Sequence, residues 1–220
     1  MTVVAIDGPA ASGKSSTANE VARRIGFLHV DSGALYRALT LVALDLGDDA
    51  TAERIIRAAE LRDVRLRVEG PRLWVLLEGG DAEPRIRSPE VTARVSPVSA
   101  MPAVREWVNK RLRDLAANGG SLVLDGRDIG TAVFPDAAIK VYLDASPETR
   151  AKRRLEQHGR RVDPETLAAE TARIAARDQA DSTRAVAPLK AADDAIHIDS
   201  GGLTFEEQVG QIVDLVRRGT

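Results

Sequence analysis

The 220-residue chain contains no cysteine. This absence excludes disulfide bridges, cysteine-ligated zinc and a cysteine nucleophile. The histidines His29, His158 and His197 lack the spacing of metal ligands, and we interpret them as ordinary surface or strand residues. The formal net charge is only −2, which disfavours nucleic acid or an anionic membrane as a partner.

Long apolar runs are also missing. No stretch approaches the roughly 20 apolar residues that cross a bilayer, and no basic-then-apolar leader precedes the first strand signal. The length suits one large domain or a core with insertions. We therefore expect a cytoplasmic monomer with a single domain over residues 1–220.

The most informative stretch follows an apolar run at residues 3–6. It has the pattern G-x-x-x-x-G-K-S and precedes a helical pattern at 14–25. A strand, a glycine loop and a helix N-terminus together form an anion cradle. We expect Lys14 to reach the β- and γ-phosphates of a nucleoside triphosphate, and the hydroxyl of Ser15 to hold Mg²⁺. A flexible glycine and serine turn is the alternative, which the flanking strand and helix disfavour. The predicted phosphate loop consists of Gly8, Pro9, Ala10, Ala11, Ser12, Gly13, Lys14, Ser15 and Ser16.

Strand and helix patterns alternate along the chain. Strand signals occur at 3–6, 27–30, 122–124, 139–143 and 195–198. Helical patterns occur at 14–25, 34–46, 104–117, 147–157, 164–181 and 205–217. Such alternation predicts an α/β fold with a parallel five-stranded sheet and helices on both faces. The strands then end at one edge of the sheet, where ligands bind in such folds.

One region breaks the alternation. Residues 63–68 alternate polar and apolar, the turn signal Gly70-Pro71-Arg72 follows, and 73–77 is apolar. This pattern predicts an antiparallel hairpin, which a third short strand near 81–86 could join. We interpret 61–87 as a small β insertion.

Polar residues follow two of the predicted strands. Asp31 and Ser32 come after the second strand, and either cap a helix or bind a ligand. Arg37 lies one turn further on, where a solvated helix face is the alternative to binding. Asp125 is placed like an acid that holds Mg²⁺ through water, or it forms a turn with the next glycine. Arg127 brings a guanidinium suited to phosphate beside the loop.

A basic stretch at 150–161 carries six positive charges against one negative. A mobile arginine-rich flap would stabilise a transferring phosphoryl group and exclude water. A solvated helix face and a nucleic-acid patch are the alternatives, and the missing aromatics disfavour the latter. Farther on, Arg177, Asp181 and Arg184 would share one helix face, either as an ion-pair ladder or as a substrate site.

Six stretches together resemble the bacterial cytidylate kinase family of nucleoside monophosphate kinases. They read IDGPAASGKSS at 6–16, DSGALYR at 31–37, DGRDIGT at 125–131, FPDA at 134–137, RDQADSTRAVAPL at 177–189 and IDS at 198–200. The 61–87 hairpin also matches, since bacterial members carry a β insertion. The resemblance implies a monophosphate-binding region at 31–105, a helical lid at 150–164, and a core made of the rest.

The resemblance also implies roles in a substrate pocket. The implied cations for the CMP phosphate are Arg37, Arg127 and Arg177. The implied cytosine readers are Ser96, Arg105 and Asp128. The implied ribose-side contacts are Asp181 and Arg184, and Ser32 and Tyr36 line the same pocket. Catalysis is expected to use Lys14, Arg127, Arg153 and Arg154, with Mg²⁺ at Ser15 and Asp125.

The implied reaction is phosphorylation of CMP or dCMP by ATP. Cytosine suits the implied readers, because a carboxylate or hydroxyl accepts from its N4 amino group and an arginine donates toward N3 or O2. Uracil reverses that pattern and would leave buried polar groups unpaired. The motifs at 31–37 and 177–189 disfavour adenylate and shikimate kinases. A GTPase is disfavoured because no Asn-Lys-x-Asp motif is present, and a nucleic-acid-binding protein because of the net charge.

Overall fold

A five-stranded parallel sheet forms the centre of the computed structural model, which describes residues 1–70 and 72–219. The strand order is β2-β6-β1-β7-β8, and neighbouring strands pair in parallel. The strands are β1 Val3–Asp7, β2 Leu28–Asp31, β6 Leu122–Gly126, β7 Ile139–Asp144 and β8 Ile196–Asp199. The predicted parallel sheet is thus confirmed.

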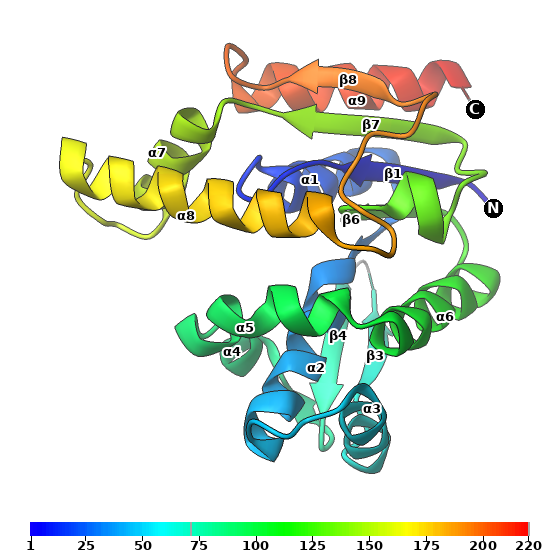
Figure 1. The fold of residues 1–220 in the computed structure, drawn as a ribbon. Helices are drawn as coiled ribbons and strands as arrows, with labels where there is room; N and C mark the ends of the chain where they lie inside the picture. Colours follow the sequence, from blue (N-terminus) through cyan, green and yellow to red (C-terminus); the bar gives the residue numbers. More distant parts are fainter. Residues whose placement is uncertain (71, 220) are drawn as a thin grey trace.

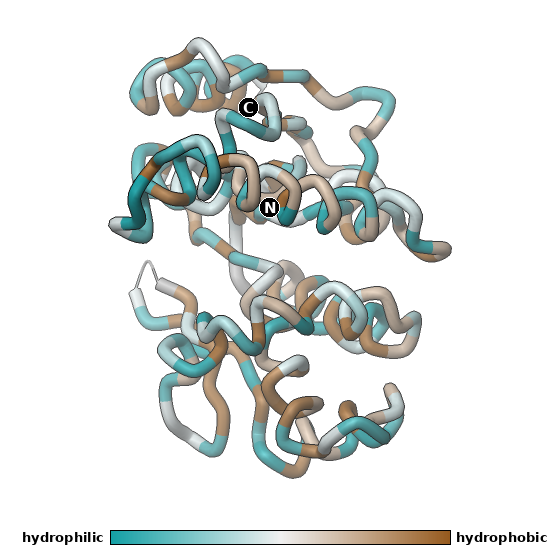
Figure 2. Tube along the Cα trace, turned by 60° about the vertical axis from the view of Figure 1, so that its left-hand side comes forward, coloured by the Kyte–Doolittle hydropathy of each residue, from teal (hydrophilic) through white to brown (hydrophobic). Residues whose placement is uncertain are grey.

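Helices cover both faces of this sheet, and because side chains alternate along each strand, neighbouring residues pack in different clusters. Val4 and Ile6 pack in one cluster with residues of helices α1 (Lys14–Ile25) and α9 (Phe205–Gly219). Val3 and Ala5 point the other way, into a larger cluster shared with α2 (Ser32–Leu46) and α6 (Pro102–Gly119). Hydrophobic and hydrophilic residues alternate along the helices (Figure 2), as expected for helices that bury one side.

Residues 32–119 form a second lobe below the sheet (Figure 1). We call it the lower lobe and the rest of the chain the upper lobe. Besides α2 and α6, the lower lobe contains a three-stranded antiparallel sheet and three more helices. These elements are α3 Ala52–Leu61, β3 Arg65–Glu69, β4 Arg72–Leu77, β5 Gly80–Asp81, α4 Glu83–Ile86 and α5 Pro89–Ala100.

The expected hairpin is present as β3 and β4, whereas the expected strand over 81–86 is largely wrong. Strand β5 pairs only at its two residues, and α4 begins at Glu83. The Glu83 amide donates to the Asp81 side chain, and Pro84 has no N–H to give to a sheet. Pro71, in the expected turn, lies outside the described residues. The sequence reasoning also missed α3 and α5, whose N-capping residues are Thr51 and Ser88.

Two helices project together from the upper lobe (Figure 1): α7 (Pro147–Gln157) and α8 (Pro164–Thr183). Each begins with a capped first turn containing proline, at Ser146 and at Asp163. They pack on each other, and the expected helical lid at 150–164 covers most of α7 and its connection to α8. No helix within the described ranges is long and apolar enough to cross a membrane.

Candidate active site

A cleft of about 690 Å³ opens between the two lobes and is lined by residues from both. Most residues predicted from the sequence meet here. They are Ala11, Ser12, Gly13, Lys14, Ser15, Ser16, Ser32, Tyr36, Arg37, Arg105, Asp125, Arg127, Asp128, Arg153, Arg154, Arg177, Asp181 and Arg184. Four other predicted residues do not line the cleft, namely Gly8, Pro9, Ala10 and Ser96.

The phosphate loop joins β1 to α1 at the carboxyl edge of the sheet. Its first residue, Gly8, has φ +150°, and a Cβ there would collide with the carbonyl oxygen of Leu143. Gly13 adopts a left-handed conformation just before α1. Lys14 is 4% exposed, and its Nζ donates to the Pro9 carbonyl at 2.5 Å and to Ser12 Oγ at 3.2 Å. Burial, followed by the nearby Arg127, lowers the pKa of Lys14 well below its usual value.

Ser15 and Asp125 meet at the mouth of the loop. Ser15 Oγ donates to one carboxylate oxygen of Asp125 at 2.5 Å, and His29 Nε2 lies 2.7 Å from the other. A hydroxyl and a carboxylate are oxygen ligands that Mg²⁺ accepts, so these residues fit a magnesium site. His29 lies in β2, as expected for a strand residue, and in addition contacts the predicted site residue Asp125.

Ser32 is not the helix cap considered in the sequence analysis. It is the first residue of α2, and its hydroxyl donates 2.7 Å to the backbone carbonyl of Asp125. Asp31 takes the N-cap position but makes no capping bond with its side chain. Its carboxylate instead pairs with Arg87 at 2.7 Å. Ser32 therefore ties the start of α2 to the end of β6.

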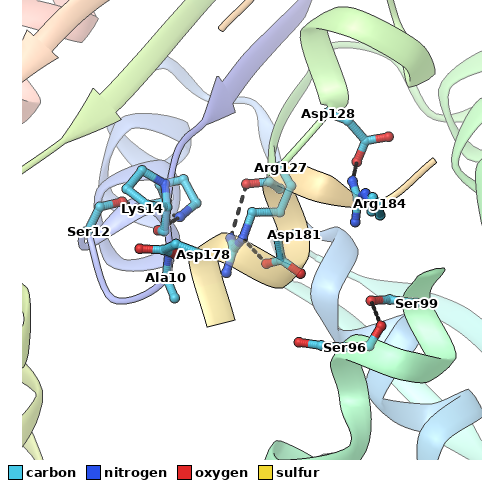
Figure 3. A network of polar contacts seen from close by, with 12 residues as sticks. Ala10, Ser12, Lys14, Ser96, Ser99, Arg127, Asp128, Asp178, Asp181 and Arg184 are labelled. Carbon is cyan, nitrogen blue, oxygen red and sulfur yellow. Dashed lines mark hydrogen bonds and ion pairs between the residues drawn. The ribbon is translucent and has the colours of Figure 1, made fainter. Parts of the chain in front are cut away.

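Three arginines from different elements gather opposite the phosphate loop. Arg37 donates to the hydroxyl of Thr92 at 2.8 Å, and Arg127 to the carboxylate of Asp181 at 3.2 Å (Figure 3). The Nε of Arg177 is buried and has no hydrogen-bond partner among the residues that the structure describes. Burial and then the neighbouring Arg127 lower the pKa of Arg177 to about 9, and burial lowers that of Arg37 to about 10. A bound anion would relieve this crowding of desolvated cations.

A second polar group lies deeper in the cleft. Asp128 accepts from Arg105 with one carboxylate oxygen, and from Arg184 at 3.2 Å with the other (Figure 3). Arg105 is only 2% exposed, and its guanidinium lies 5.4 Å from the ring centre of Tyr36. Asp128 lies 23 positions from Arg105 and 56 from Arg184 in the sequence, and only the fold gathers both arginines around its carboxylate.

The predicted base reader Ser96 is half-buried on α5. The hydroxyl of Ser99, one turn along, donates to the Ser96 carbonyl at 3.0 Å, and Arg105 donates to the Ser99 carbonyl at 3.1 Å. Ser99 lines the cleft and was missed by the sequence reasoning. Its spacing from Ser96 is a usable signal, because residues three apart share a helix face.

The arginines of the basic stretch at 150–161, most of which lies on α7, have different roles. Arg153 and Arg154 line the cleft. Arg153 donates to the hydroxyl and carbonyl of Ser200 at 2.9 and 2.5 Å, and Arg154 pairs with Glu170 at 3.1 Å. Arg150 does not line the cleft; it is buried and bonds to backbone carbonyls and to Asp178. The six charges therefore do not act as one cationic face.

Asp7, at the end of β1, was also missed by the sequence reasoning. It is 5% exposed, and its two oxygens accept from the amides of Ile129 and Gly130 at 2.8 and 2.7 Å. Burial raises the pKa of Asp7 to about 6, although those backbone hydrogen bonds lower it. The bond joins the start of the phosphate loop to the segment that follows Asp128.

Comparison with known proteins decides the family. The family model described as cytidylate kinase matches residues 4–218. This chain belongs to the cytidylate kinase family. It is 47% identical over 216 residues to the cytidylate kinase of Geobacillus sp. (strain WCH70), which covers 97% of this chain and 95% of that relative. It is 45% identical over 224 residues to that of Mycobacterium avium (strain 104), with 98% and 95% covered. The resemblance inferred from the motifs is confirmed.

Solved structures support the fold. An uncharacterized protein from Eubacterium ventriosum ATCC 27560 aligns with a TM-score of 0.52 and 13% identity. The alignment covers 99% of this chain and 98% of that protein. At this identity the likeness concerns the fold alone, while membership of the cytidylate kinase family rests on the sequence comparisons.

Proposed function

We propose that this chain transfers the γ-phosphoryl group of ATP to CMP or dCMP, forming CDP or dCDP and ADP. Membership of the cytidylate kinase family supports this activity. The observation that carries it is the pair of anion sites in one cleft: a phosphate loop on one side, and the cluster of Arg37, Arg127 and Arg177 on the other. Two phosphate-bearing substrates would meet between them.

The donor is bound by the phosphate loop in this proposal. Backbone amides at the start of α1 and the Nζ of Lys14 face the cleft, where the β- and γ-phosphates of ATP would lie. ATP would draw Lys14 away from Pro9 and Ser12, because a phosphate oxygen is a stronger acceptor for an ammonium group. A Mg²⁺ ion at Ser15 and Asp125 would neutralise charge that develops on the phosphates.

The acceptor phosphate is bound by the three arginines. Asp181 holds Arg127 from α8 and Thr92 holds Arg37 from α5, so each guanidinium is oriented before the substrate arrives. The pKa of Arg177 is lowered by desolvation and by Arg127. A dianionic phosphate would therefore replace repulsion among cations with hydrogen bonds.

The base of CMP is read by the group around Asp128. Its carboxylate accepts from the N4 amino group, while Arg105 donates to the adjacent edge. The hydroxyl of Ser96, which does not line the cleft, would join as a second acceptor only if α5 moved toward the bound base. Asp128 already accepts from two arginines, but each carboxylate oxygen has a second lone pair for N4. Asp181 and Arg184 face the ribose, and Ser32 and Tyr36 line the same pocket.

An oxygen of the CMP phosphate attacks the γ-phosphorus of ATP in line with the departing ADP. The new P–O bond forms as the bond to the β-phosphate oxygen breaks. No protein nucleophile is used, and no general base, because the attacking phosphate is already anionic at neutral pH. Positioning and charge stabilisation by Lys14, Arg127, Arg153 and Arg154 supply the rate.

The same proposal assigns functions to segments of the chain. Residues 31–105 bind the monophosphate, 61–87 insert into that region, and 150–164 act as the lid within one domain. The protein would work as a cytoplasmic monomer, because both substrate sites and the cations around them come from one chain.

Initial rates with ATP and a panel of nucleoside monophosphates test the function. CMP and dCMP are expected to give kcat/KM values at least tenfold above UMP, AMP and GMP. The panel also includes shikimate as a control for the related small-molecule kinases. Equal rates with all the monophosphates, or none with CMP, would contradict the proposal.

A further inference from the structure

Helices α7 and α8 both form hydrogen bonds with the backbone of a single residue of the phosphate loop, Ala10. From α8, the Asp178 carboxylate accepts from the Ala10 amide at 2.8 Å. From α7, the Arg150 guanidinium donates to the Ala10 carbonyl at 2.8 Å. Asp178 and Arg150 also pair with each other at 2.5 Å, so the three residues close a ring of hydrogen bonds. The proposed chemistry assigns no role to either charged side chain.

The ring is largely buried, with the Asp178 side chain 17% exposed, and neighbouring atoms support it. Arg150 is 4% exposed, and its Nε donates to the Ala145 carbonyl at 2.8 Å. Ala10 is 1% exposed and packs in a small apolar cluster with Ala151 of α7 and Ile174 of α8. A charge-assisted hydrogen bond in such surroundings is stronger than one at the surface. Ala10 thus has little freedom to move away from the two helices.

The backbone of the next residue is strained, and the hydrogen bonds to Ala10 oppose the relaxation of that strain. Ala11 has φ +59°, the left-handed region that a residue with a Cβ adopts only at a cost in free energy. Ala11 lines the cleft beside Ser12 and Gly13. Because the peptide before Ala11 is fixed at Ala10, the left-handed turn at Ala11 is retained, and with it the path of the loop along the cleft.

We propose that Asp178 is a positioning residue, which holds the phosphate loop in its donor-binding shape by fixing Ala10 and thereby the strained turn at Ala11. Its sequence neighbour Arg177 faces the cleft, while Asp178 faces the back of the loop, beside Ala10 in Figure 3. One turn of α8 therefore sets the distance between the donor loop and the cation cluster. The inference rests on the proposed ATP-binding function.

The test measures the dissociation constant of MgATP by calorimetry without acceptor, and the KM for CMP at saturating ATP. We expect Asp178→Ala to weaken MgATP about ten-fold, the effect of one lost hydrogen bond to a charged group, with the KM for CMP unchanged. Asp178→Asn keeps an acceptor for the Ala10 amide, so it should weaken MgATP about three-fold at most. Gln179→Ala, an exposed change on the same helix, serves as the matched control.

A second background tests the strain directly. Glycine adopts the left-handed region freely, so Ala11→Gly removes the backbone strain at residue 11 whose relaxation Asp178 opposes. In that background Asp178→Ala should weaken MgATP by only about three-fold, and an undiminished ten-fold loss would overturn the strain argument. Unchanged MgATP affinity in Asp178→Ala, or an equal loss for MgATP and CMP, would overturn the positioning role. Failure of the wild type to bind MgATP would instead contradict the proposed function.

Discussion

At the scale of single residues, the site is built from buried charges whose partners are backbone atoms or other charges. Lys14 lies against Pro9 and Ser12, and Asp128 is shared between two arginines. Burial without full compensation shifts several pKa values, as for Lys14 and Arg177. Lys14 and Arg177 should therefore contribute little to stability and much to ligand binding, so separate measurements of folding and of catalysis distinguish the two effects.

Lys14→Ala should lower kcat by about a hundred-fold or more, since it removes a cation aimed at the transferring phosphate. The melting temperature should not fall, because burial already disfavours the charged lysine. Steady-state kinetics and thermal unfolding measure the two quantities. Lys110→Ala, which removes an exposed lysine paired with Asp114, is the control. Near-normal turnover by folded Lys14→Ala would contradict the phosphate-loop assignment.

Asp128→Ala should change the choice of base. Uracil has no N4 amino group to give, so the kcat/KM for CMP should fall strongly and that for UMP much less. The ratio of the two should drop roughly 10- to 150-fold, the value of a lost hydrogen bond to a charged group.

The same variant should also be less stable, because Arg105 is left buried without its partner. Measuring both substrates on one preparation cancels any loss of folded protein. A proportional fall for CMP and UMP would mean that Asp128 supports the phosphate site through Arg127 and does not read the base.

At the scale of elements, the helix pair α7 and α8 is fixed at the end that contacts the phosphate loop and is less constrained at the connection between the two helices. Arg150 and Asp178 tie the fixed end to the phosphate loop, whereas Arg160 and Arg161 in the connection are exposed and only loosely paired. Backbone hydrogen bonds at exposed, weakly packed positions open most easily. The connection between α7 and α8 is thus the part of the helix pair that can adjust to nucleotides.

Amide hydrogen exchange should show this adjustment. Residues 150–164 should exchange more slowly when a bisubstrate analogue is bound, because Arg153 and Arg154 would gain phosphate contacts and close the lid. The buried half of α6 around Leu112, which does not line the cleft, is the internal reference. Equal protection of the lid with and without the analogue would favour a solvated helix instead.

At the scale of the whole molecule, the cleft depends on bonds that join distant strand ends. Ser15 reaches Asp125 across 110 positions, and Asp7 reaches Gly130 across 123. These bonds converge on the carboxyl edge of the sheet between the two lobes. Global stability is therefore coupled to the ionisation of groups at this edge.

The pH dependence of unfolding should reveal Asp7. Its pKa of about 6 in the folded chain exceeds the ordinary 3.8, because burial and the charge of Asp128 outweigh the two amide hydrogen bonds and Lys14. The folded state thus holds more protons between pH 4 and 6. Asp7 contributes stability that is present below about pH 4 and lost as the pH rises through about 6.

The free energy of unfolding should fall by about 3 kcal/mol as Asp7 ionises, which follows from the size of the shift in its pKa. Denaturant unfolding of the wild type and Asp7→Asn across pH 4 to 7 measures it as a difference. The stability of Asp7→Asn relative to the wild type should rise by that amount toward pH 7. A difference that stays constant with pH would show that Asp7 does not titrate as described.

The sequence by itself determined the family, the phosphate loop and the parallel sheet. Each depends on local signals: the G-x-x-x-x-G-K-S pattern sets backbone geometry within eight residues, and apolar periodicity sets helix and strand. Because parallel strands end at one edge, the sequence also predicted that Ser15 and Asp125 would lie at a common site. Residue 83, by contrast, begins a helix, because Pro84 cannot donate to a sheet and the Glu83 amide donates to the Asp81 side chain, and together these override a weak strand signal.

Only the tertiary structure decided which charged residues brace the site and which face the ligands. Within one basic stretch, Arg153 lines the cleft while Arg150 is buried against Ala10. Asp178 and Arg177 are neighbours in sequence, yet they serve the loop and the cleft respectively. The contact between Asp178 and Ala10 spans 168 positions, and it depends on how α8 packs across the sheet edge. No local pattern encodes that packing, because it results from burial summed over the whole core.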